Sequence, residues 1–142
     1  MRLLLCLLLI GFIPAKNFAS SPEKRILYVT INEAGRVMVG ADMIDINDVP
    51  TELKNRLFKS SLGNRKYSKI SISKSGENVS LTSFDQLKTK VQEGQQMALN
   101  AICLEKFKTL FAELDDKKKE KLRKQFPVLF QMEYSWLHEK NL

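Results

Sequence analysis

The chain has few of the residues that carry most enzymatic chemistry. Its 142 residues include one histidine, His138, and two cysteines. Hydrolytic triads and zinc sites need several histidine, cysteine and carboxylate side chains at converging positions, so this composition all but excludes histidine-based catalysis. The six glycines are scattered singly, so no glycine run is present to cradle a phosphate. We therefore predict no catalytic, cofactor-binding or metal-binding residues.

Carboxylates alone can support catalysis, and three of them lie close together in the sequence. Asp42, Asp45 and Asp48 surround an expected turn, but their spacing lacks the glycine and closing glutamate of a calcium loop. This favours turn and helix-capping roles for the three residues. A secreted enzyme that uses carboxylates is a competing class, and it needs two acids in one cleft.

The first residues resemble a targeting segment. The apolar run Leu3 to Ile13 ends at Pro14 and is shorter than the roughly 20 residues that cross a bilayer. We predict a signal peptide over residues 1–19, cleaved after Ala19, followed by one exported domain over residues 20–142. A short membrane anchor is the alternative.

Export changes what the cysteines and the charge imply. Removal of the signal peptide takes away Cys6 and leaves Cys103, which favours a buried apolar role and, as an alternative, pairing between chains. The net charge of +7 falls by the two charges of Arg2 and Lys16, to +5. An exported basic domain is expected to meet an anionic membrane surface, cell-wall polymer or acidic protein, and not nucleic acid. The lysines and arginine of residues 117–124 are expected to form a solvated helix face.

The hydrophobic pattern predicts a small α+β domain. It indicates strands over 26–31, 36–39, 69–73 and 128–132, a turn at 40–42 and a helix from Asp48 to about Ser60. It also indicates a long helix from Thr82 or Ser83 through Leu114, either bent at Gly94 or long enough to absorb the cost of that glycine, and a basic helix from Asp115 to Phe126. This order describes a two-layer sandwich, with a small mixed sheet of about four strands and helices on one face.

Aromatic residues gather after the last predicted strand. Val128, Phe130, Tyr134 and Trp136 are the candidate partner interface, because exposed aromatics beside a sheet edge commonly build one. A single tryptophan that closes the core is an equal alternative.

The order of these segments resembles the periplasmic domain of the ExbD/TolR family, in its Bacteroidetes type. The resemblance rests on Ile26 to Val39 with its Glu33-Ala34-Gly35 turn, Met43 to Pro50, Ile70 to Ile72, Thr82 to Phe84, Lys90 to Gln92, and Leu114 to Pro127. It covers about Ile26 to Glu133. The individual motifs are short, and their order carries the resemblance.

The resemblance implies a dimeric, partner-binding domain of a TonB-type transport system, working with an ExbB-like channel subunit. The family carries a proton on an aspartate in its membrane helix, whereas Leu3 to Ile13 contains no acid. We therefore expect a non-catalytic accessory protein of the periplasm that binds the TonB or ExbD apparatus, or cell-wall polymer, through its sheet edge. An uncleaved subunit anchored in the inner membrane is the alternative.

Overall fold

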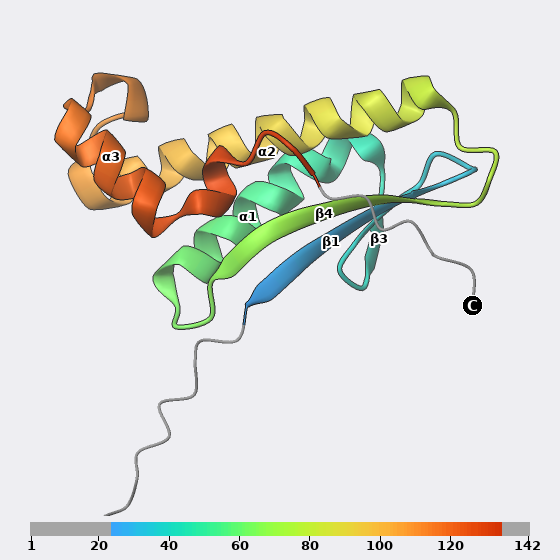
Figure 1. Ribbon diagram of the computed structural model, residues 1–142, viewed down its shortest axis with the longest axis horizontal. Coiled ribbons are helices and arrows are strands. Elements are labelled where there is room, and N and C mark those ends of the chain that lie inside the picture. Colours follow the sequence, from blue (N-terminus) through green and yellow to red (C-terminus); the bar gives the residue numbers. More distant parts are fainter. Residues whose placement is uncertain (1–23, 135–142) are drawn as a thin grey trace, which may run out of the picture.

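The computed structural model describes residues 24–134, which form one four-stranded sheet covered on one face by helices (Figure 1). The elements are β1 (Arg25–Asn32), β2 (Val37–Val39), β3 (Asp42–Ile44), η1 (Ile46–Asp48), α1 (Val49–Leu62), β4 (Tyr67–Ser75), α2 (Leu81–Phe107), η2 (Phe111–Glu113), α3 (Asp116–Gln125) and η3 (Pro127–Phe130). The predicted α+β class, with a mixed sheet of four strands, is confirmed.

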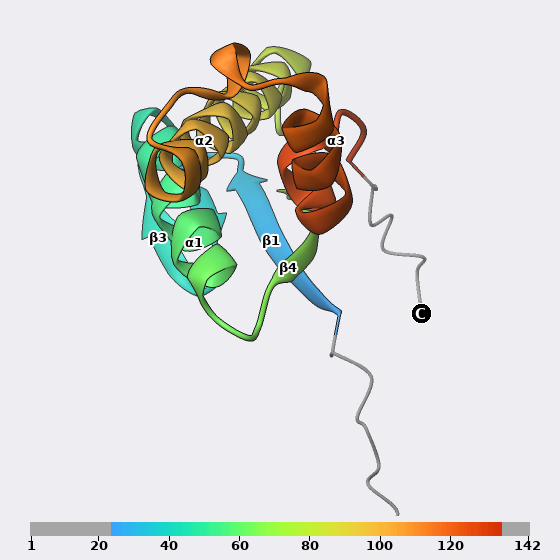
Figure 2. The ribbon, with the colours of Figure 1, turned by 90° about the vertical axis from the view of Figure 1, so that its left-hand side faces the viewer.

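The sheet has the strand order β3-β2-β1-β4. The β1–β2 and β2–β3 pairs are antiparallel, whereas β1 and β4 are parallel, so α1 makes the crossover between them. This order makes β4, the longest strand, an edge of the sheet. Figure 2 shows α1 and α2 on one side of the sheet and α3 beside β4.

Alternation along the strands builds the core. Leu27, Val29 and Ile31 of β1 are at most 2 % exposed, while Tyr28 between them is 46 % exposed on the opposite face. Leu27 pairs with Ile70 of β4 in parallel register, so inward residues of neighbouring strands lie side by side. The face predicted from the sequence is therefore the buried one.

The predicted first hairpin and first helix are confirmed. Gly35 has a φ of +76° in the β1–β2 turn, a conformation that glycine adopts without strain. The helix that was expected from Asp48 to about Ser60 runs as α1 over Val49–Leu62. The strand β3 was not expected, because its first residue, Asp42, falls within the predicted turn at 40–42.

The strand predicted over 128–132 is wrong, since Pro127–Phe130 is the short 3-10 helix η3. The backbone N–H of Leu129 donates to the carbonyl oxygen of Phe126 at 3.0 Å, which closes a turn. Val128 and Leu129 are adjacent and both are buried, whereas a strand would turn them to opposite faces. The fourth strand of the sheet is β3 instead.

The long helix begins and ends earlier than predicted. The side chain of Ser80, and not of Thr82 or Ser83, caps α2, because its oxygen accepts the N–H of Ser83 at 3.0 Å. The helix ends at Phe107, after which Lys108 adopts a left-handed conformation with a φ of 59°. It runs through Gly94 as one helix.

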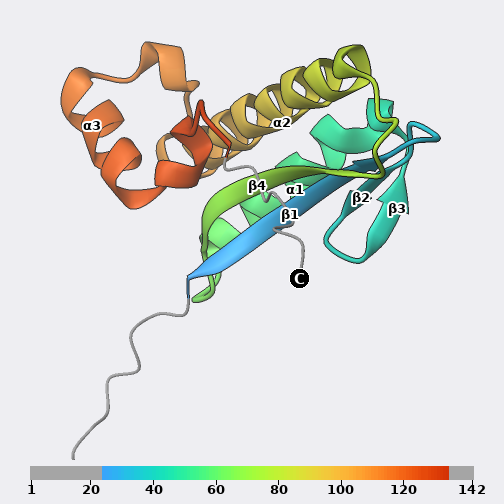
Figure 3. The ribbon, with the colours of Figure 1, turned by 45° about the vertical axis from the view of Figure 1, so that its right-hand side comes forward.

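The start of β1, the α1–β4 connection and α3 lie toward the same end of the molecule, away from the β1–β2 turn (Figure 3). This arrangement positions the groove described below. Within residues 24–134, no helix is both long and apolar enough to cross a membrane.

Candidate functional site

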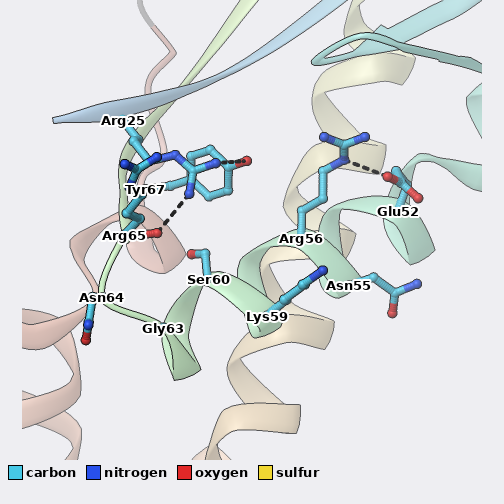
Figure 4. A pocket seen from close by; sticks show the side chains of 10 residues that line it. All are labelled: Arg25, Glu52, Asn55, Arg56, Lys59, Ser60, Gly63, Asn64, Arg65 and Tyr67. Atoms are coloured by element: carbon cyan, nitrogen blue, oxygen red, sulfur yellow. Dashed lines mark hydrogen bonds and ion pairs between the residues drawn. The ribbon is translucent and has the colours of Figure 1, made fainter. Parts of the chain in front are cut away.

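A basic groove opens at this end of the sheet, with a volume of about 580 Å³. Helix α1, the loop that follows it and the first residues of β1 and β4 supply its walls. The lining residues are Arg25, Glu52, Asn55, Arg56, Lys59, Ser60, Gly63, Asn64, Arg65 and Tyr67. Figure 4 shows Arg25, Arg65 and Tyr67 on one side of the groove and Asn55, Arg56 and Lys59 on the other.

Helical spacing brings the polar residues of α1 to one wall. Glu52, Arg56 and Lys59 follow one another at intervals of four and three residues, so they share a helix face. The opposite face carries Leu53 and Leu57, which are buried against the core. Burial of that apolar face thus turns the charged one toward the groove.

Arg56 forms an ion pair with Glu52, the one acidic side chain among the described residues that line the groove. Its Nε lies 2.6 Å from Oε1 of Glu52, and its Nη2 also contacts the carboxylate of Asp42 on β3. Burial alone would lower the pKa of Arg56, but hydrogen bonds and charge attraction from the two carboxylates outweigh burial and raise it. Arg56 is therefore shared between two carboxylates, and the three side chains together carry one formal negative charge.

Arg25 is held by neutral oxygens. Its guanidinium donates to the carbonyl oxygen of Arg65 at 3.0 Å and to the hydroxyl of Tyr67 at 3.2 Å. The same guanidinium lies 4.5 Å from the centre of the Tyr67 ring, a cation–π distance. These contacts orient Arg25 without neutralising its charge.

Lys59 and Arg65 have no carboxylate partner among residues 24–134. Together with Arg25 they place three positive charges around the groove, against the one negative charge left by Arg56 with Glu52 and Asp42, so the formal balance is 3 − 1 = +2. Asn55, Ser60 and Asn64 add amide and hydroxyl groups between them. The arrangement is suited to holding an anion.

The groove was not predicted, although the sequence contains a signal for it. Residues 53–76 include seven lysines and arginines and no aspartate or glutamate. The segment 117–124 has a more obvious local signal, because six of its eight residues are lysine or arginine. The charges of 53–76 are dispersed along a helix, a loop and a strand. Folding brings three of them, Arg56, Lys59 and Arg65, together with Arg25 of β1 around the groove.

A second feature lies at the β4 edge of the sheet. Oε1 of Gln131 accepts the backbone N–H of Ile70 at 2.8 Å, and Nε2 of Gln131 donates to the carbonyl oxygen of Ile70 at 2.8 Å. A shallow hollow of about 510 Å³ adjoins this contact. Its walls are Ser68, Lys69, Pro127, Gln131, Glu133 and Tyr134.

Buried Gln95 of α2 ties the segment after α3 to the core. Its Nε2 donates to the carbonyl oxygens of Val128 at 2.7 Å and Gln131 at 3.1 Å, and its Oε1 accepts the hydroxyl of Tyr134 at 2.6 Å. Burial raises the pKa of Tyr134 to about 12. Gln95 therefore positions Gln131 against β4.

Three of the four residues of the candidate partner interface pack against the rest of the domain. Val128 is 5 % exposed, Phe130 is half-buried with its ring 5.5 Å from that of Phe111, and Tyr134 is half-buried on Gln95. Trp136 and His138 lie outside the described residues. A partner interface formed by Val128, Phe130, Tyr134 and Trp136 stays a prediction.

The remaining candidate groups have structural contacts. Asp45 caps η1 by accepting the N–H of Asn47, while Asp48 makes no side-chain cap bond to α1. Cys103 is fully buried on α2, as predicted, and burial raises the pKa of its thiol. Residues 24–134 contain no group of three or more histidine, cysteine or acidic side chains placed to hold a metal ion.

Comparisons with protein-family models, curated proteins and solved structures found no match for the chain.

Proposed function

We propose that this protein is an ExbD-like accessory module of the periplasm that binds a protein partner without catalysis. The partner places an extended segment along the outer edge of β4, as an additional strand. TonB-like and ExbD-like proteins are the partner class that the sequence resemblance implies.

The contact between Gln131 and Ile70 carries this proposal. One side-chain amide bonds both the N–H and the carbonyl oxygen of Ile70, each at 2.8 Å. A neighbouring strand would offer a backbone amide to the same two atoms. Gln131 therefore acts as a single-residue substitute for a strand, and an incoming segment would displace it.

The surroundings of this contact support strand addition. β4 is nine residues long and forms an edge of the sheet, the position at which a partner can add a strand. The hollow next to Gln131 leaves room for side chains of the added segment. Lys69, exposed at this edge, favours an acidic one.

Binding of the full-length protein to purified TonB-like and ExbD-like periplasmic domains from the same cell tests this proposal. Gln131→Ala removes the competing amide, so we expect about 10-fold tighter binding, the value of one or two hydrogen bonds. Lys69→Glu reverses the charge exposed at this edge of β4, so we expect binding of an acidic segment to weaken by a similar factor. Biolayer interferometry measures both.

Gln96→Ala is the matched control, because Gln96 is exposed on α2 beside Gln95. Its affinity should equal that of the unmodified protein. Equal affinities for all four proteins, or no binding to either domain, would contradict strand addition at β4.

A further inference from the structure

We infer that the basic groove binds the phosphate of an anionic phospholipid headgroup, so that this end of the domain rests on a membrane surface. Two observations carry the inference: the net positive charge of the groove and an exposed leucine at its rim. Neither involves the β4 edge contact, so the inference is independent of the proposed function.

The charges of the groove match a phosphate group. Lys59 and Arg65 lack an acidic partner within residues 24–134, and Arg25 is bonded only to a carbonyl oxygen and a hydroxyl there. Guanidinium groups bind phosphate oxygens through paired N–H donors, and lysine adds a mobile charge. Arg56 pairs with both Glu52 and Asp42, and the other three cations still leave the groove with a formal charge of about +2, which attracts an anion.

An apolar side chain stands at the rim of the same groove. Leu62, the last residue of α1, is 61 % exposed and precedes Gly63, which lines the groove. Surfaces that bind membranes combine cations at the headgroup level with apolar side chains that enter the acyl boundary. A small soluble phosphate would make no use of an exposed leucine, so this observation favours a lipid.

The groove is also near the N-terminal apolar run along the sequence. Arg25 is both the first residue of β1 and a wall of the groove. Eleven residues, 14–24, separate it from the run Leu3 to Ile13, and eleven residues span at most about 40 Å. If this run is retained as the short membrane anchor, it keeps the groove within reach of the same lipid surface; if it is cleaved, the cations and Leu62 make the contact without it.

Further cations extend the basic surface at this end. The ammonium groups of Lys66 and Lys106 lie 4.9 Å and 5.6 Å from the centre of the Phe126 ring, and this aromatic contact leaves their charges unneutralised. Lys66 follows Arg65 in the α1–β4 loop, so the cationic surface continues from the groove toward α3. A planar anionic surface can engage both regions at once.

Vesicle flotation of the full-length protein tests the inference. Phosphatidylcholine vesicles with and without phosphatidylglycerol are compared for the unmodified protein and for the Lys59→Gln/Arg65→Gln variant. We expect binding that depends on phosphatidylglycerol and that weakens roughly 30-fold in the variant, given about 1 kcal/mol for each cation near the surface. Because both residues are exposed, circular dichroism should show an unchanged fold.

Lys117→Gln/Lys121→Gln is the matched control, with the same change of charge on exposed residues of α3. We expect it to lose about threefold or less in vesicle affinity. Equal losses in the two double variants would assign binding to diffuse charge and overturn the groove assignment. Groove variants that bind like the unmodified protein would overturn it as well.

Leu62→Ser distinguishes a lipid from free phosphate. We expect this variant to bind phosphatidylglycerol vesicles several-fold more weakly, while inorganic phosphate at constant ionic strength displaces neither protein efficiently. If Leu62→Ser binds vesicles normally and inorganic phosphate displaces the unmodified protein, the groove is a site for free phosphate and the lipid assignment is wrong. The groove variants leave Ile70 and Gln131 unchanged. Their binding to a TonB-like or ExbD-like domain therefore tests the proposed function independently of vesicle binding.

Discussion

Gly94 of α2 lies directly against Leu53 of α1: a Cβ atom at position 94 would lie 2.7 Å from the Cβ of Leu53 and 3.0 Å from the carbonyl oxygen of Pro50. A helix-interior glycine costs about 1 kcal/mol relative to alanine. Here the glycine lets two helices pack with their backbones close together. The packing of α1 on α2 explains why α2 runs through Gly94 without interruption.

Gly94→Ala should therefore destabilise the protein despite the better helix propensity of alanine. The added methyl group forces α1 and α2 apart, and we expect a net loss of about 1–3 kcal/mol in the free energy of unfolding. Urea denaturation measures this loss. Gly63→Ala is the control, because its Cβ would meet nothing closer than 3.8 Å at a φ of −99°, so its stability should be unchanged or slightly raised. Equal stability of the two variants would contradict the close helix contact.

Gln95→Ala should destabilise the protein by about 2–3 kcal/mol, because it leaves buried carbonyl oxygens of the segment after α3 without a donor. Gln95 is 3 % exposed and donates to Val128 and Gln131. Gln96→Ala, exposed on the same helix, should change the free energy by about 0.5 kcal/mol or less. Chemical denaturation of both variants makes the comparison, and similar losses would show that the Gln95 bonds are not needed.

Asp115→Ala should loosen the start of α3. The carboxylate of Asp115 accepts the backbone N–H of Lys118 at 2.8 Å, and this bond lowers the pKa of Asp115. Because the pKa is lowered in the folded protein, the stabilisation is present above the ordinary carboxyl range and is lost as the pH falls through the folded pKa. Hydrogen exchange at Lys118 and Lys119 should accelerate several-fold in Asp115→Ala at neutral pH, and Asp115→Asn should restore protection. Unchanged exchange in the alanine variant would rule out a capping role.

Tyr134 should make stability fall at alkaline pH. Its pKa is raised from 10.0 to about 12 in the folded protein, so its contribution is complete below about pH 10 and disappears as the pH rises toward 12. Between these limits the unmodified protein should lose about 1–2 kcal/mol more than Tyr134→Phe, a value reduced for solvent screening. Denaturation curves across this range test it. Since lysine titration affects both proteins, parallel losses would show that Tyr134 ionises normally.

The elements with a clear local sequence pattern were predicted correctly. Alternation identified β1 and β4, the glycine turn identified the first hairpin, and Asp115 marked the start of α3. The strand predicted over 128–132 failed because its alternating pattern competes with Pro127 and with the Gln95 side chain, which satisfies carbonyl oxygens that a strand would have paired. A partner 33 residues away cannot be inferred from local spacing.

The sequence alone thus determined the fold class, the buried strand faces and the scarcity of residues for histidine-based chemistry, because periodicity and composition act locally. Only the tertiary structure decided that Gln131 bonds the edge of β4 and that Arg25, Lys59 and Arg65 line one groove. These residues come from separate elements. Their proximity depends on how the helices pack on the sheet, and no spacing along the chain encodes it.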